Sequence, residues 1–186
     1  YREMITKVVI GAGVTKLTNN AFCGCINLTE AEFAENSSLT MIGGGAFKSC
    51  SSLESIQLPE GLTTISGNAF KYCRSLREVY LPNTISQIDG LAFTGLSDVT
   101  FSVAYGSYAK SWAESQGFAY VEREPAQIAS GTCGENLSWT LGSDGLLTID
   151  GTGSMATYYG ETNIPWYAYR EMITKVVIGA GVTKLT

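Results

Sequence analysis

The sequence contains no histidine, no long hydrophobic run and no basic cluster. The lack of histidine excludes Ser-His-Asp triads, imidazole general bases and imidazole metal ligands. A membrane-spanning helix needs roughly eighteen consecutive apolar residues, so no segment is expected to cross a bilayer. The 12 lysines and arginines are scattered among 17 acidic residues, which gives a net charge of −5. This balance lacks the basic footprint of a nucleic-acid-binding protein.

A phrase that repeats along the chain is the strongest positive signal. Each copy has an alternating apolar stretch, a Gly or Pro turn with a second short apolar stretch, and then Ala-Phe-x-x-Cys-x-x-Leu. The phenylalanines of the four copies are Phe22, Phe47, Phe70 and Phe93, at intervals of 25, 23 and 23 residues. Two extra residues near 35–38 account for the longer first interval. Because a unit of about 23 residues cannot bury its own apolar face, the units are expected to stack.

The alternating stretch of each copy predicts a strand with one buried face. Ile56 and Leu58 point to one side and Gln57 to the other, which is the pattern of a half-buried strand. Four such strands predict a parallel ladder with an apolar inner row. That row is Val8/Ile10, Ala31/Phe33, Ile56/Leu58 and Val79/Leu81. The Ala-Phe segment predicts a short helical or 3₁₀ turn. We therefore predict an α/β solenoid: a right-handed, leucine-rich stack with a parallel β ladder.

Residues 100–121 are expected to close this stack as a helical C-terminal cap. Ser107 is a suitable N-cap for a helix over 108–116, and Gly117 is a stop signal. Residues 118–121 could add a last strand. The solenoid is thus expected over 1–121.

Beyond a charged, proline-containing linker at 122–130, the period changes. Two alternating stretches flank Asp144-Gly145, which predicts a β-hairpin. Pro165 suits the start of a short helix. We interpret 131–186 as a β-hairpin module that forms the N-terminal cap and first strand of a following solenoid.

A second repetition is exact in sequence. Residues 1–18, YREMITKVVIGAGVTKLT, recur unchanged at 169–186, an offset of 168. One explanation is a window cut from tandem, near-identical modules, or an engineered repetition. The other is head-to-tail assembly through the duplicated segment. The sequence leaves both open.

The phrase at 53–76 resembles the BspA-like (Treponema-type) leucine-rich repeats of bacterial surface proteins. Residues 105–121 resemble the cap of such arrays, and the opening of 131–139 resembles a module that precedes them. The fourth repeat departs from the pattern with Leu96 in place of cysteine. The resemblance implies a protein that is extracellular or on the cell surface of a bacterium. It also implies adhesion to host or bacterial surface proteins or glycans, and no catalytic residue.

The cysteines are expected to be structural and not ligands. Cys25, Cys50 and Cys73 share one slot of the repeat, so the period already explains them as small core residues. A structural zinc site typically uses paired Cys-x₂-Cys ligands, whereas Cys23 and Cys25 are separated by one residue. Disulfides between rungs are an alternative, although five cysteines, with Cys133, cannot all pair. Cys23, outside the shared slot, is expected to be the most exposed thiol.

Two glycine-rich stretches do not predict a nucleotide site. Gly11-Ala-Gly13 and Gly151-Thr-Gly153 lack the following helix that a dinucleotide fingerprint requires. Glu30, Glu32, Glu54 and Glu78 lie on or beside the exposed strand face, where charge keeps a sheet soluble, and no pocket-forming element accompanies them. We expect neither cofactor, metal nor enzymatic activity.

The outward face of the ladder is the candidate partner-binding site. Its side chains form two rows across the strands. One row is Lys7, Glu30, Ser55 and Glu78, and the other is Val9, Glu32, Gln57 and Tyr80. A solenoid holds such rows rigidly, and Tyr80 is the member most like an interface anchor. We predict a non-enzymatic adhesion module, with a structural fibre subunit as the alternative.

Overall fold

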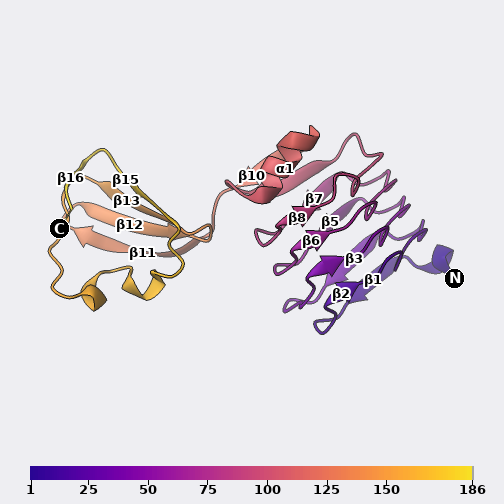
Figure 1. Cartoon of the computed structure of the whole chain (residues 1–186), viewed down its shortest axis with the longest axis horizontal. Coiled ribbons are helices and arrows are strands. Elements are labelled where there is room, and N and C mark those ends of the chain that lie inside the picture. The colour runs from indigo at the N-terminus through magenta and orange to yellow at the C-terminus, as the bar shows by residue number, and fades with distance from the viewer. Residues whose placement is uncertain (186) are drawn as a thin grey trace. The chain divides into compact units, whose positions relative to one another are not determined.

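The computed structural model describes residues 1–185 and divides into two compact units, Tyr1–Arg123 and Glu124–Thr186 (Figure 1). The strands reach further into the expected linker than the sequence suggested. Strand β10 (Ala119–Arg123) ends the first unit and β11 (Gln127–Gly134) begins the second, so only 124–126 of the predicted linker at 122–130 lie outside strands. Pairing with β9 (Thr100–Ala104) continues through Glu122 and Arg123, although their charge is typical of a linker. Thr186 lies outside the described residues.

The first unit is the predicted solenoid, with one short strand per turn on its main sheet face. These strands follow one another along the unit in Figure 1. They are β1 (Lys7–Ile10), β3 (Glu30–Phe33), β5 (Ser55–Gln57), β7 (Glu78–Tyr80) and β9 (Thr100–Ala104). A second row of two-residue strands is β2 (Lys16–Leu17), β4 (Met41–Ile42), β6 (Thr64–Ile65) and β8 (Gln87–Ile88). All pairings in both rows are parallel, as the stacking of equivalent segments requires.

The sequence predicts one continuous main ladder, but the structure divides it into two sheets. Strand β1 pairs with β3, and β5, β7, β9 and β10 form a separate sheet; among the described residues no ladder joins β3 to β5. The second row runs unbroken from β2 to β8. The break follows the turn that carries the two-residue insertion after Phe33. Phe33 is only half-buried there, whereas its equivalents Leu58 and Leu81 in the next rungs are buried.

A stack of phenylalanine rings fills the interior beside the Ala-Phe turns. Phe47, Phe70 and Phe93 are buried, and consecutive centroids lie 5.2 and 5.0 Å apart with rings 5° and 4° from parallel. The chain holds this spacing by hydrogen bonds between rungs: Phe47 N–H donates to Ala69 O at 2.8 Å and Phe70 N–H to Ala92 O at 2.8 Å. The predicted stacking of the units on a shared apolar interior is confirmed.

The repeat cysteines pack beside this stack as free thiols. Cys50 Sγ donates to Phe22 O at 3.2 Å, and Cys73 Sγ donates to Phe47 O at 3.0 Å. Burial raises the pKa of the Cys73 thiol to about 12. All five cysteines lie in the described part of the chain and none is paired, so the rung-disulfide alternative is wrong; Cys23 is the one that is not buried.

The cap forms as its sequence signals predict. Helix α1 (Tyr108–Gln116) starts where Ser107 Oγ accepts from Lys110 N–H at 3.2 Å, and it ends at Gly117, which has a φ of 73°. Its Trp112 ring lies 5.6 Å from Phe93 and 5.3 Å from Phe101, so it covers the last rungs of the core.

The second unit is a small sheet with the predicted hairpin at its centre. Strands β12 (Leu137–Gly142) and β13 (Leu146–Gly151) pair antiparallel, β11 joins β12, and β15 (Lys175–Ile178) pairs parallel with β13. Trp139 lies 5.9 Å from Trp166 and 6.3 Å from Tyr169, ring to ring. The remaining elements are η1 (Arg2–Met4) in the first unit, and β14 (Gly153–Ser154), β16 (Val182–Lys184), η2 (Glu161–Asn163) and η3 (Tyr167–Tyr169) in the second.

Candidate binding face

The eight predicted site residues lie in two rows, and the break between β3 and β5 divides these rows into two blocks of four residues. In the first block Lys7 lies opposite Glu30 and Val9 opposite Glu32. In the second block Ser55 pairs with Glu78, and Gln57 with Tyr80. All are exposed except Tyr80, which is half-buried. We call this outward surface of the main strands the ladder face.

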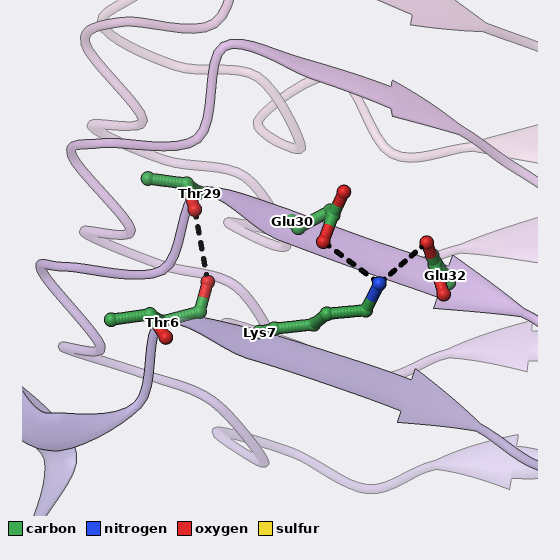
Figure 2. Close-up of polar contacts among 5 residues, drawn as sticks. All are labelled: Thr6, Lys7, Thr29, Glu30 and Glu32. Atoms are coloured by element: carbon green, nitrogen blue, oxygen red, sulfur yellow. Dashed lines mark hydrogen bonds and ion pairs between the residues drawn. The ribbon is translucent and has the colours of Figure 1, made fainter.

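The first block is organised around one lysine, as Figure 2 shows. Lys7 Nζ lies 2.9 Å from Glu30 Oε2 and 2.7 Å from Glu32 Oε1. The hydrogen bonds to Glu30 and then Glu32 raise the pKa of Lys7 above its ordinary value. Because two carboxylates share one ammonium group, this block keeps a net negative charge.

The second block is organised around Tyr80, whose ring is held from two sides. Tyr80 Oη donates to Glu60 Oε1 at 2.9 Å, and the guanidinium carbon of Arg123 lies 3.8 Å from the ring centroid. Arg123 also donates to the carbonyl oxygens of Leu81, at 2.7 Å, and Ser102. Burial, followed by donation to Glu60, raises the pKa of Tyr80. The predicted anchor is therefore a fixed ring, which has little rotamer freedom left to lose on binding.

Two hollows meet at Gln57 and Tyr80. One, of about 540 Å³, extends over β5, β7 and β9 and is lined by Ser55, Glu78 and Ser102 among others. The other, of about 480 Å³, lies at the break in the ladder and includes Glu32, Phe33 and Glu60. Both are open, shallow surfaces with mixed polar and apolar linings. Such surfaces suit contact with a macromolecule better than enclosure of a small ligand.

Sequence reasoning missed the part of the ladder face that the cap supplies. Thr100 continues the row of Glu78, and Ser102 and Val121 continue the row of Tyr80. The alternation of 100–104 and 119–123 carried this signal, but those residues were interpreted only as a cap. Arg77 and Asp98 also line the larger hollow. These two residues lie just before strands and outside the alternating pattern, so the sequence does not indicate that they belong to the ladder face.

Within residues 1–185, no three histidine, cysteine or acidic side chains converge as a metal site. No helix in the same range is long and apolar enough to cross a membrane. What the ladder face offers is hydrogen bonding, charge and one aromatic ring on a rigid frame.

Comparisons with known proteins agree with the fold. Residues 1–110 match the family described as BspA type Leucine rich repeat region, in six copies. A leucine-rich repeat protein from Bacteroides ovatus is similar at 26% identity and a TM-score of 0.55, over 65% of this chain and 31% of that one. The T. pallidum leucine rich repeat protein is similar at 30% identity and a TM-score of 0.51, over 54% and 46%. A leucine rich cell surface protein from Faecalibacterium prausnitzii matches at 21% identity and a TM-score of 0.41, over 82% and 49%.

The chain spans between about a third and a half of the length of these three proteins. A search of curated proteins finds no match. Repeat solenoids present extended surfaces that bind other proteins, and they are not in general enzymes. Since the family match covers more than half of its residues, the chain belongs to the BspA-type leucine-rich repeat family.

Proposed function

We propose that the chain is a recognition module of a bacterial surface or secreted protein, and that it binds a protein partner through the ladder face. The observation that carries this proposal is the fixed ring of Tyr80 between two open hollows. An aromatic anchor held before binding limits the entropic cost of association. Glycans are the second class of partner that such a polar, aromatic surface could take. Placement outside the cell rests on the surface proteins of the family.

A binding screen against matrix proteins, bacterial surface proteins and glycan arrays tests this proposal. The informative variants are Tyr80→Ala and Glu78→Lys, which change the centre of the ladder face. Tyr105→Ala is the matched control, because Tyr105 is an exposed aromatic residue of the same unit outside both hollows. We expect at least a tenfold loss of affinity for the first two variants and none for the control. Equal binding by all variants would remove the ladder face from consideration.

A second candidate is a structural subunit that assembles head to tail through the segment shared by 1–18 and 169–186. One observation favours it: the four residues of β15, which repeat β1, are all exposed. Sedimentation velocity and electron microscopy over a concentration series test this candidate. We expect end-to-end chains at high concentration, and a strictly monomeric protein would count against it.

A further inference from the structure

The two copies of the duplicated segment use opposite edges of the same strand. In the first copy, the edge that includes the carbonyl oxygens of Thr6 and Ile10 faces the next rung. Thr6 O accepts from Thr29 N–H at 2.9 Å and also from Thr29 Oγ1 at 3.1 Å (Figure 2), and Ile10 O accepts from Ala34 N–H at 3.0 Å. Among the described strands, β1 pairs with β3 alone. The other edge of β1, which carries the N–H and C=O groups of Lys7 and Val9, therefore has no partner strand in residues 1–185.

In the second copy the opposite edge is the one that is paired. Thr174, which corresponds to Thr6, donates its N–H to Gly145 O at 2.9 Å. Gly179, which corresponds to Gly11, donates its N–H to Ile149 O at 2.8 Å. Strand β15 pairs with β13 alone among the described strands. One copy thus shows how the segment binds the strand after it, and the other shows how it binds the strand before it.

Burial of the side chains gives the same division. Ile10 is 4% exposed, but its equivalent Ile178 is 44% exposed. Leu17 is 6% exposed, but Leu185 is 52% exposed. At the other end of the segment, Tyr169 packs against Trp139, whereas its equivalent Tyr1 is fully exposed. At these positions, each copy buries side chains that the other leaves exposed.

At two positions of the segment, the structure explains the presence of glycine in only one of the two copies. A side chain added at Gly11 or Gly13 would meet nothing within 4 Å. A side chain added at the equivalent Gly179 would run into Asp150, and one at Gly181 would run into the backbone of Gly151. Docking on the strand that precedes the segment therefore requires the absence of a Cβ at Gly181, where the atom met is backbone, and at Gly179 a Cβ would force the Asp150 side chain to turn away. Neither glycine of the first copy is needed for the fold of the solenoid around residues 11–13.

We propose that β13 is a docking site for residues 1–18 of a second molecule, which take the place of residues 169–185. In the register of the resident strand, Val9 would lie opposite Thr148, as Val177 does now. The free edge of β1 would then be paired, and β13, β1 and β3 would form one ladder across two molecules. This inference deepens the head-to-tail candidate above and rests on it.

Addition of β1 to the open edge of β15 is the alternative geometry, and it is less favourable. In a stack of equivalent rungs it would place Lys7 beside Lys175, and like charges directly opposite are destabilising. In the observed pairings, Lys7 lies opposite Glu30 and Lys175 lies opposite Leu146. Exchange on β13 would place Lys7 between Glu30 and Leu146, which are the neighbours seen in the two observed pairings.

The resident segment acts as a competitor for this site. It carries the same sequence as the incoming strand, so neither has better contacts with β13. It is also tethered, and a short tether supplies an effective concentration of about millimolar. The unaltered chain is thus expected to exchange weakly, and weakening the resident segment should promote assembly.

The test uses the full chain carrying Gly179→Ala and Gly181→Ala, which weaken the resident segment and leave residues 1–18 intact. We expect the dissociation constant for self-association, measured by sedimentation velocity, to fall at least tenfold. Adding Gly11→Ala and Gly13→Ala should abolish this association, since the incoming strand would then carry the same clash. Ala12→Ser is the matched control in that loop, because Ala12 and its equivalent Ala180 are both exposed. Unchanged association in the first variant, or association that survives the Gly11 and Gly13 substitutions, would overturn the proposal.

A peptide with the sequence of residues 1–18 separates specific exchange from exposure of a damaged core. We expect it to bind the Gly179→Ala, Gly181→Ala chain and to dissociate its assemblies, while the Gly11→Ala, Gly13→Ala peptide does neither. Equal binding of both peptides would sink the proposal even if the altered unit were partly unfolded. Hydrogen exchange then distinguishes the two geometries, because the alanines make the two copies differ in mass. Exchange on β13 protects residues 6–11 and exposes residues 174–179, whereas addition to the open edge of β15 protects residues 6–11 and adds protection within residues 174–179. Assembly with the second pattern would leave the fibre candidate standing and refute exchange.

Discussion

Arg123, the last residue of the first unit, lies over the ring of Tyr80 with its guanidinium carbon 3.8 Å from the ring centroid. Strands β8 and β9 and helix α1 lie between these residues in sequence order, yet the cap returns its last side chain to the ladder face. The same guanidinium donates to the carbonyl oxygen of Leu81. The cap therefore closes the hydrophobic core with Trp112 and also fixes the proposed binding residue.

Replacing Arg123 should weaken both stability and recognition. Arg123→Ala removes the cation–π contact and the hydrogen bonds to Leu81 and Ser102, so we expect a loss of about 2 kcal/mol in the free energy of unfolding. Urea denaturation followed by circular dichroism measures it. Arg123→Lys keeps the charge but lacks the planar guanidinium that stacks on Tyr80 and donates from two nitrogens, so its loss should be intermediate. Arg74→Ala is the control, because Arg74 lies farther from its aromatic partner, at 6.0 Å from Tyr72. If Arg123→Ala and Arg74→Ala have equal effects, Arg123 has no bracing role.

The Phe70 ring should contribute more to stability than the ring at the start of the stack. Phe70 is fully buried between Phe47 and Phe93, so Phe70→Ala should reduce the free energy of unfolding by about 3–5 kcal/mol. Phe22 is half-buried and contacts one ring of the stack, at 5.3 Å, so Phe22→Ala should cause roughly half that loss. Equilibrium denaturation of the two variants compares them directly. Equal losses would contradict the stacked interior.

The period of the sequence was enough to predict this stack, since Phe47, Phe70 and Phe93 recur at a fixed interval and must face the same way. The sequence also predicted the cap helix, because Ser107 and Gly117 are local signals for its start and its end. It could not predict the break between β3 and β5, since a two-residue insertion does not reveal which of two ladders it disrupts. Nor could it predict that Arg123 contacts Tyr80, because that contact depends on how far the cap turns back. Periodic and local features were accessible, and contacts that depend on tertiary placement were not.

Thiol labelling should single out Cys23. The pKa of Cys73 is raised to about 12 by burial, and the pKa values of Cys25, Cys50 and Cys133 are raised for the same reason. Because the thiolate is the reactive form, iodoacetamide at pH 8 should modify Cys23 in the folded protein and the other four cysteines only after unfolding. Intact mass and peptide mapping count the labels. Fast labelling of Cys50 or Cys73 in the folded protein would contradict their burial.

Stability at alkaline pH should depend on Tyr80. The pKa of its hydroxyl is raised above the ordinary value of 10.0, mainly by burial and then by the hydrogen bond to Glu60. A raised pKa means that the protonated form is favoured by folding. Its contribution is therefore complete below pH 10 and is lost as the pH rises through the folded-state pKa. Tyr80→Phe should be less stable than the unaltered chain at pH 8, and the difference should shrink above pH 10. Urea midpoints at several pH values measure it, and a constant difference would show that ionisation of Tyr80 is not coupled to folding.

Glycine substitutions should separate positions that hold the rungs together from positions that do not. A Cβ at Gly43 would lie 2.6 Å from Leu17 O and 2.8 Å from Asn19 N, and both are backbone atoms that cannot turn aside. Gly43→Ala must therefore push β4 away from β2, and we expect a loss of about 2 kcal/mol or more in the free energy of unfolding. Gly11→Ala has open space and should change stability by less than about 0.5 kcal/mol. Thermal melts of both variants at a concentration where the protein is monomeric make the comparison. A destabilised Gly11→Ala protein would mean that Gly11 already serves the fold of its own molecule, which would also remove the reason to assign it to docking.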